Sequence, residues 1–157
     1  MVSIYWCCKQ KSGIRKIEVN ENLAESYLKM AENAIGTMNR EKNYNLTFSI
    51  SACYYSMYYS LYAILMKIGI KCEIHACTIE FMKQFLNKFY SQENIQLIKK
   101  AFDLRNISQY HVEKIINKKD SELIIEQAPS FVTKSKEILS QLNQNQINKI
   151  REEINLK

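Results

Sequence analysis

The sequence predicts an all-α fold, an up-and-down bundle of about five helices preceded by a short extended segment. Its 157 residues fit one domain and include only 3 glycines and 1 proline, too few for the turns of a sandwich, a barrel or a wound α/β fold. A hydrophobic fraction of 46% with 24% charged residues excludes a disordered chain. We divide the chain into an N-terminal strap or loose hairpin over 1–19, a helical bundle over 20–143, and a polar C-terminal tail or helix extension over 144–157.

The first two expected helices carry end signals. Asn22, with Glu25 three residues later, forms a capping-box pattern ahead of an amphipathic helix that ends near Met38. A second helix is expected over 45–68, where Gly69 stops it. This helix is apolar on several sides, which is typical of a central helix or of one shared between a core and an interface. Its aromatic face, which we assign to an interface or to packing, consists of Tyr55, Tyr58, Tyr59 and Tyr62.

The remaining elements follow from the same helical spacing. A third helix is expected over 76–89, and Ser91 can cap a fourth that reaches into the segment 105–112. A fifth helix begins near Asp120, and we expect a kink or a break at Pro129. The polar tail could extend the last helix, dock on a partner or fray.

A cytoplasmic protein without membrane association is the simplest interpretation. The uncharged segment 43–66 is long enough to span a bilayer, but tyrosines and serines occupy its centre, where membrane helices are aliphatic. The N-terminus has no secretory signal, and the 5 cysteines are an odd number, so we expect free thiols in a reducing cytoplasm. The net charge of +6 is spread over both halves and gives only weak support for an RNA partner.

The cysteines allow one alternative, a zinc site. Cys72, His75 and Cys77 could bind zinc together with Cys7 and Cys8, but the spacing Cys-x2-His-x-Cys is not a standard zinc motif. In the competing interpretation, His75 caps the next helix and the thiols pack inside. No phosphate-binding glycine loop and no carboxylate cluster is visible, so we expect no metal and no cofactor.

The residues best suited to chemistry are Arg105 and His111. The chain has only four arginines and two histidines, and these two lie six residues apart at the end of an apolar stripe. An arginine offers a fork of donors for phosphate oxygens, and a histidine can accept and return a proton. The pair would suffice for metal-free RNA cleavage that yields a 2′,3′-cyclic phosphate.

Their spacing also allows a structural role. Six residues on a straight helix leave two side chains roughly 120° apart, so one regular helix cannot aim both at one atom. Either the helix is irregular here or a second subunit completes the site. In the structural alternative, Arg105 pairs with a buried acid or a helix end and His111 is a hydrogen-bonded core residue.

Several stretches resemble the HEPN domain family (higher eukaryotes and prokaryotes nucleotide-binding), in its small stand-alone prokaryotic or archaeal form. The resemblance covers roughly residues 20–140 and rests on the opening helix over 20–32, the small and aromatic residues over 51–59, His75 with Phe81, and Arg105-Asn106 followed by His111.

This resemblance implies a homodimer that joins the Arg–His segments of two chains in a composite, metal-independent ribonuclease site. It also implies a toxin or defence component, often beside a small nucleotidyltransferase antitoxin. By the same resemblance Arg105 binds the scissile phosphate, Asn106 orders the site and His111 is the general acid and base. Tyr110 precedes His111, whereas some toxin relatives carry a modified tyrosine after the histidine, so we give Tyr110 a supporting role. The alternative is a non-catalytic module that binds a nucleotide or a protein and partners a nucleotidyltransferase.

Overall fold

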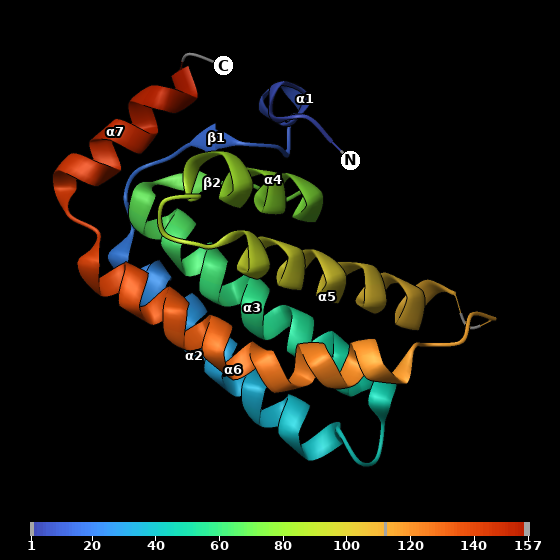
Figure 1. Cartoon of the computed structure of the whole chain (residues 1–157). Helices are drawn as coiled ribbons and strands as arrows, with labels where there is room; N and C mark the ends of the chain where they lie inside the picture. Colours follow the sequence, from blue (N-terminus) through green and yellow to red (C-terminus); the bar gives the residue numbers. More distant parts are fainter. Residues whose placement is uncertain (1, 112, 156–157) are drawn as a thin grey trace.

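The computed structural model describes residues 2–111 and 113–155, most of them helical (Figure 1). The helices are α1 (Ile4–Lys9), α2 (Glu21–Glu41), α3 (Leu46–Ile68), α4 (His75–Phe85), α5 (Gln92–Tyr110), α6 (Lys118–Gln141) and α7 (Gln144–Asn155). Two short strands, β1 (Arg15–Lys16) and β2 (Ile70–Lys71), pair antiparallel. The all-α prediction is confirmed, with seven helices in these ranges instead of about five. Val112 of the predicted site segment, Met1, and residues 156–157 of the tail lie outside the described residues.

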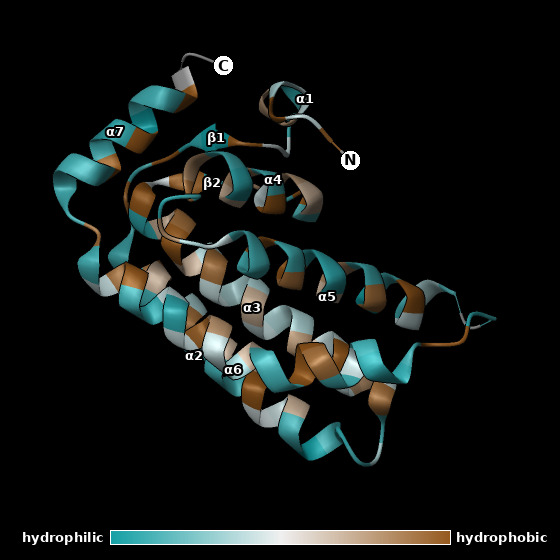
Figure 2. Cartoon of the chain, in the orientation of Figure 1, coloured by the Kyte–Doolittle hydropathy of each residue, from teal (hydrophilic) through white to brown (hydrophobic). Residues whose placement is uncertain are grey.

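Helix α3 lies at the centre and packs against α2, α5 and α6. Most of its positions are buried, and the colouring in Figure 2 shows apolar or neutral residues along its length while the outer helices are hydrophilic on one side. The predicted bounds hold here. The Asn45 side chain caps the start by accepting a hydrogen bond from the Phe48 backbone, and Gly69 ends the helix with φ +77°. The central position explains the absence of a polar face.

Helix α2 begins earlier than predicted, because Asn20 caps it and Asn22 does not. The Asn20 side chain accepts a hydrogen bond from the Leu23 backbone at 2.8 Å. Its own backbone N–H donates to the carbonyl of Met66 at 3.1 Å, which holds Asn20 in an extended conformation outside the helix. A contact between residues distant in sequence therefore selects between two local cap signals.

Three buried hydroxyls link α3, α6 and the segment before α5. The hydroxyls of Tyr90 and Ser135 lie 2.7 Å apart, and those of Ser135 and Ser60 lie 3.0 Å apart. All three side chains are essentially inaccessible to solvent. A buried polar group without a partner costs about 1–3 kcal/mol, so this network holds the three elements at one relative position.

The N-terminal segment is not a hairpin. Residues Ile4–Lys9 form a helix, capped by the Ser3 side chain, and the strand after Gly13 pairs with β2 instead of with the preceding residues. A disulfide between Cys7 and Cys77 ties α1 to α4. The sequence suggested that these two cysteines are free thiols, and for them this prediction is wrong. The bond also removes two of the five candidate zinc ligands.

The middle of the chain departs from the prediction at the end of the third helix. The prediction continued this helix to residue 89, but α4 ends at Phe85 and a turn follows it. The turn brings Tyr90 into the core, where it is 1% exposed. Ser91 caps the start of helix α5, as predicted, and its side chain forms a capping box with Asn94.

Helix α6 continues unbroken through Pro129, so the predicted break does not form. Proline removes one backbone hydrogen bond, but Ala128 and Phe131 beside it are buried against the core. Pro129 itself lies on the exposed side of the helix. Packing on the inner face outweighs the local cost.

The tail forms a separate helix, α7, that folds back on the bundle instead of extending α6 (Figure 1). The Arg151 guanidinium donates to the carbonyl oxygens of Ile17, Ile68 and Gly69 at 3.1, 2.8 and 2.7 Å. Ile147 and Ile150 are buried on the same side. The tail therefore covers the end of α3.

None of the described helices combines the length and hydrophobicity that crossing a bilayer demands.

Candidate functional site

Arg105 lies on the half-buried side of α5, facing α3. One guanidinium nitrogen, Nη2, donates to the Tyr55 hydroxyl at 2.8 Å, and Nη1 donates to the Asn106 side chain at 3.0 Å. The guanidinium carbon lies 5.5 Å from the Tyr55 ring centre and 5.4 Å from the Tyr110 ring centre. The structure thus brings together four residues singled out from the sequence.

The charge of Arg105 has no carboxylate partner among the described residues. Its contacts are a hydroxyl, an amide and two aromatic rings. Its third nitrogen, Nε, is buried and has no hydrogen-bond acceptor. The expected alternative, pairing with a buried acid, is therefore wrong. A cation with spare donors in this position suits an anionic ligand.

His111 is the residue that ends α5. Its backbone N–H donates to the Ile107 carbonyl, and its side chain is 45% exposed. The imidazole Nδ1 lies 3.4 Å from a Glu113 oxygen, and a backbone hydrogen bond together with His111 lowers the pKa of Glu113. His111 is not a core residue, so this alternative is also wrong. Its described contacts do not include Arg105.

The aromatic face of α3 divides into a buried and a half-buried part. Tyr58 and Tyr62 are buried, and Tyr62 accepts a hydrogen bond from the Cys72 backbone at 3.2 Å. Tyr55 and Tyr59 are half-buried and stack with ring centres 5.4 Å apart. Tyr27 of α2 extends this row, 6.1 Å from the Tyr59 ring. Tyr58 and Tyr62 therefore pack in the core, whereas Tyr55 and Tyr59 reach the surface on the side of Arg105.

His75 joins the same group of residues, although it was not selected as a site residue from the sequence. Its Nδ1 lies 2.8 Å from the Tyr54 hydroxyl, and its ring stacks on Tyr58 at 4.2 Å. The edge of its ring faces Tyr55 at 6.2 Å. Burial, and then the positive charge of Arg105, lower the pKa of His75. The helical spacing of Tyr54 and Tyr58 puts them on one face, but no local signal places residue 75 there.

Apolar side chains that are exposed or half-buried lie along one side of α2 and α3. We call this surface the tyrosine face; its members are Leu23, Tyr27 and Met30 of α2 and Phe48, Ala52, Tyr55 and Tyr59 of α3. Spacings of three and four residues place each set on one side of its helix. The contact between Tyr27 and Tyr59 joins the two sets. Tyr110, beside Arg105, is 67% exposed.

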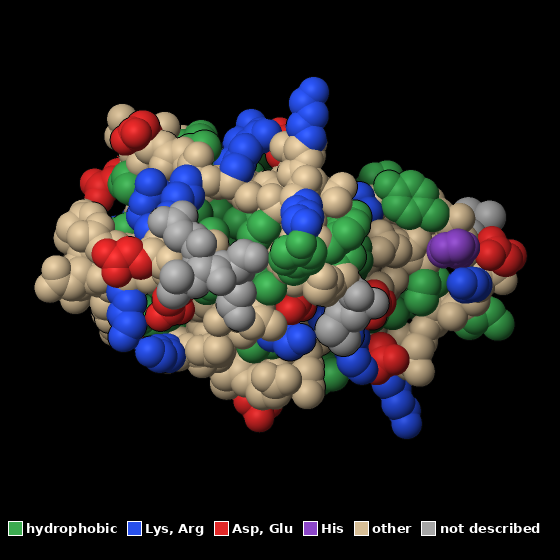
Figure 3. All heavy atoms as spheres, turned by 90° about the horizontal axis from the view of Figure 1, so that it is seen from above, with side chains coloured by type: hydrophobic (Ala, Val, Ile, Leu, Met, Phe, Trp, Pro, Cys, Tyr) green, Lys and Arg blue, Asp and Glu red, His purple; other side chains and the backbone are tan. Residues whose placement is uncertain are grey.

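The surface charges form no block of a single sign on the side of the molecule shown in Figure 3, where basic and acidic side chains alternate with hydrophobic ones. This agrees with the even distribution of charge along the sequence. On this side, therefore, the basic residues behind the net charge of +6 do not form a nucleic-acid-binding stripe.

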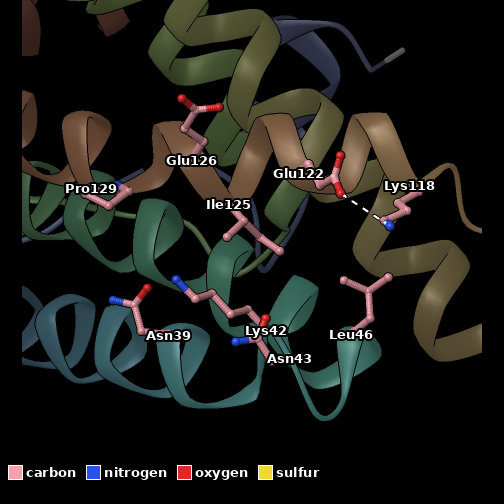
Figure 4. Close-up of a pocket in the computed structure, with 9 residues that line it drawn as sticks. All are labelled: Asn39, Lys42, Asn43, Leu46, Lys118, Glu122, Ile125, Glu126 and Pro129. Atoms are coloured by element: carbon pink, nitrogen blue, oxygen red, sulfur yellow. Dashed lines mark ion pairs between the residues drawn. The ribbon is translucent and has the colours of Figure 1, made fainter.

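A groove of about 590 Å³ lies between α6 and the α2–α3 turn (Figure 4). Its lining combines both charges and includes an ion pair between Lys118 and Glu122. Arg105 and the two histidines are not part of it. A second groove of about 590 Å³ lies between α4 and α5 and reaches Phe102, whose ring is 6.3 Å from that of His75. Of these two grooves, the second comes nearer to the Arg105 site.

Comparison with known families identifies the class of this protein. The model of the HEPN domain matches residues 21–139, which is most of the chain and covers α2 to α6 up to Leu139. The chain therefore belongs to the HEPN domain family. This supports a module of the nucleotide-binding or ribonuclease type in general. No curated protein matches the sequence.

Proposed function

We propose that this protein is a HEPN-type, metal-independent endoribonuclease whose active site is completed in a homodimer. The observation that carries the proposal is the state of Arg105, a half-buried cation with no carboxylate partner and one buried donor unused. His111 lies exposed at the end of the same helix. A second copy of the chain can supply the imidazole that Arg105 does not contact within its own chain.

The reaction needs one phosphate-binding group and two proton transfers. The ribose 2′-hydroxyl attacks phosphorus, and a neutral His111 imidazole takes its proton. The bond from phosphorus to the 5′-oxygen breaks, and a protonated imidazole gives that oxygen its proton. The products are a 2′,3′-cyclic phosphate and a 5′-hydroxyl. Arg105 stabilises the charge that develops on the phosphate oxygens, while Asn106 and Tyr110 hold its side chain in place.

The tyrosine face supports the dimer. It exposes Phe48 at 64% and Met30 at 42%, and it includes Tyr55, which contacts Arg105. Aromatic residues and methionine are enriched in interfaces between protein chains. A two-fold axis that passes through this face close to Tyr55 would make the patch meet its own copy and bring the Arg105 residues of the two chains near the interface.

The first experiment is RNA cleavage in EDTA. The purified chain is expected to cut tRNA or mRNA, and the fragments should carry 2′,3′-cyclic phosphate ends. Arg105→Ala and His111→Ala should each lose at least about 100-fold in rate. Arg40→Ala is the matched control, because Arg40 lies on the exposed side of α2 and bonds only locally to Thr37. Intact RNA together with harmless expression in cells would contradict the proposal.

Mixing the two inactive variants tests the composite site. A heterodimer of Arg105→Ala and His111→Ala contains one site with both native side chains, provided that each site takes them from different chains. Activity should then return to a substantial fraction of the native value. If each site uses Arg105 and His111 of one chain, the mixture stays inactive.

The same activity would make the chain a toxin or defence component, and a small nucleotidyltransferase would restrain it. The contact of His111 with Glu113, away from Arg105, favours a second candidate, a non-catalytic nucleotide- or protein-binding module. In that case the native chain leaves RNA intact, and both alanine variants bind the partner as the native chain does.

A further inference from the structure

The second histidine, His75, shares the surroundings of Arg105 more closely than His111 does. Tyr55 lies between them, since its hydroxyl accepts from Arg105 at 2.8 Å and its ring faces the His75 ring at 6.2 Å. Three separate elements, α3, α4 and α5, thus place an imidazole, a phenol and a guanidinium in one cluster.

We propose that His75 belongs to the Arg105 site and that its imidazole takes up a proton when a phosphate group binds the Arg105 guanidinium. The proposal rests on the proposed function only for the nature of the ligand, a phosphate or a similar dianion. It assigns His75 as a positioning residue, since it acts on the ligand through Tyr55 and Arg105.

The first argument is the hydrogen bond of His75. Its partner is the Tyr54 hydroxyl at 2.8 Å, and a hydroxyl can donate or accept. With neutral His75, the hydroxyl can donate to a bare Nδ1; with protonated His75, Nδ1–H donates to the hydroxyl oxygen. The bond persists in both states, so the imidazole can change its charge without losing its buried partner.

The second argument is the balance of charge around His75. Among the described residues, its partners from α3 are Tyr54, Tyr55 and Tyr58, and the charged group from α5 is Arg105. No carboxylate contacts it in this set. The guanidinium, after burial, keeps the pKa of His75 below its ordinary value. A dianion on Arg105 reverses the sign of the nearby charge and therefore favours the protonated imidazole.

The third argument is the unpaired Nε of Arg105. A buried donor without an acceptor destabilises the arrangement that leaves it unpaired. A ligand that draws the guanidinium into a new position, where this donor is satisfied, removes this destabilisation. Binding of an anion is therefore expected to move the guanidinium. His75 is close enough for its protonation to depend on this change.

NMR titration of the two histidines tests the proposal directly. The chain contains only His75 and His111, so each Cε1–H signal can be assigned with His75→Gln and His111→Gln. The probe is sulfate, a dianion that does not titrate near neutral pH, added to the native chain and compared with chloride at equal ionic strength. Sulfate should raise the apparent pKa of His75 by about 0.5 or more.

Two Arg105 variants provide the controls. Arg105→Met removes the charge and should abolish the effect of sulfate on the pKa of His75. Arg105→Lys keeps the positive charge and should retain part of this effect. A sulfate effect of equal size on His75 in Arg105→Met would overturn the proposal. The proposal would also be overturned if sulfate shifted the Arg105 side-chain signals of the native chain while the pKa of His75 stayed constant. The same holds if sulfate changed neither the Arg105 signals nor the pKa of His75. None of these outcomes depends on RNA cleavage, so failure here is distinct from failure of the proposed function.

Discussion

Arg105 and Tyr55 are fifty positions apart in sequence, yet the arginine donates a hydrogen bond to the tyrosine hydroxyl at 2.8 Å. This contact joins α5 to α3 at the edge of the tyrosine face. Because the Tyr55 ring also lies under the guanidinium, one side chain fixes both the position and the plane of the cation. Tyr55 is therefore the residue whose loss should misplace Arg105 most.

Tyr55→Phe keeps the ring and removes the hydroxyl. We expect the affinity for a 2′-O-methyl oligoribonucleotide to fall roughly ten-fold, since a hydrogen bond to a charged group contributes about 1.5 kcal/mol. Fluorescence anisotropy measures this change. Tyr59→Phe is the matched control one turn along α3, and equal losses in the two variants would rule out a special role for Tyr55.

At Gly69 the backbone adopts a left-handed conformation that favours glycine. Its φ is +77°, and a Cβ atom there would lie 2.7 Å from the Ile17 carbonyl oxygen. Gly69→Ala should lower the free energy of unfolding by roughly 2–4 kcal/mol, measured by urea denaturation. Gly36→Ala in α2, where a Cβ would meet Arg40 at an ordinary 3.5 Å, should instead raise it by about 0.5–1 kcal/mol. The same sign for both substitutions would contradict this account.

Arg151 holds α7 on the bundle. Arg151→Ala removes the donors for three carbonyl oxygens, so we expect about 1–3 kcal/mol less stability for the docked helix. Hydrogen exchange of residues 144–155 should become faster, while that of α3 beyond its last turn should not. Lys149→Ala, on the exposed side of α7, is the control. Unchanged exchange in Arg151→Ala would show that apolar contacts alone dock the helix.

The lowered pKa of His75 predicts how stability depends on pH. The unfolded chain binds the proton near the ordinary value of 6.5, and the folded chain binds it only at lower pH. Unfolding therefore takes up a proton between these two values, and the free energy of unfolding decreases as the pH falls through this window. Urea denaturation between pH 7.5 and pH 5 measures the slope, which should be smaller in His75→Gln than in His111→Gln. Equal slopes would exclude His75 as the source.

The cysteines should react in three stages. Cys8 is half-buried, Cys53 and Cys72 are buried, and burial raises the pKa of each thiol. Without reductant, the folded chain should take up one alkyl label, at Cys8, and two more after unfolding. Cys7 and Cys77 should react only after reduction of their disulfide. Intact mass spectrometry counts the labels, and five labels before reduction would contradict the bond.

Features set by neighbouring residues could be predicted from the sequence, whereas features set by distant contacts could not. The bounds of α3 depend on Asn45 and Gly69, both local signals, and they were predicted correctly. The cap of α2 depends on Met66, and the end of α4 depends on the burial of Tyr90, so both were misplaced. Helical spacing describes each helix separately and contains no information about its neighbours.

The candidate site shows the same division. Rarity in the sequence was enough to single out Arg105, whereas Asn106 and Tyr110, which contact it in the structure, were assigned through the resemblance to the HEPN family. His75 was considered from the sequence as a zinc ligand or a helix cap and not as a neighbour of Arg105, because its relation to Tyr54 arises from the packing of α4 on α3. The roles assigned to Arg105 and His111 stay predictions until the variants are measured.

The hydroxyl network of Tyr90, Ser135 and Ser60 constrains how the sequence can change. Apolar core residues can often be exchanged one at a time, since a neighbouring side chain fills the space. The two serines also donate to the backbone carbonyls of Met57 and Phe131. Among the described residues the Tyr90 hydroxyl bonds only to Ser135, so an apolar residue in place of Ser135 would leave a buried hydroxyl without a partner. We therefore expect Tyr90 and Ser135 to vary together among related chains, either both hydroxyl-bearing or both apolar. Such covariation would show, from sequences alone, in which related chains these elements keep the same relative position.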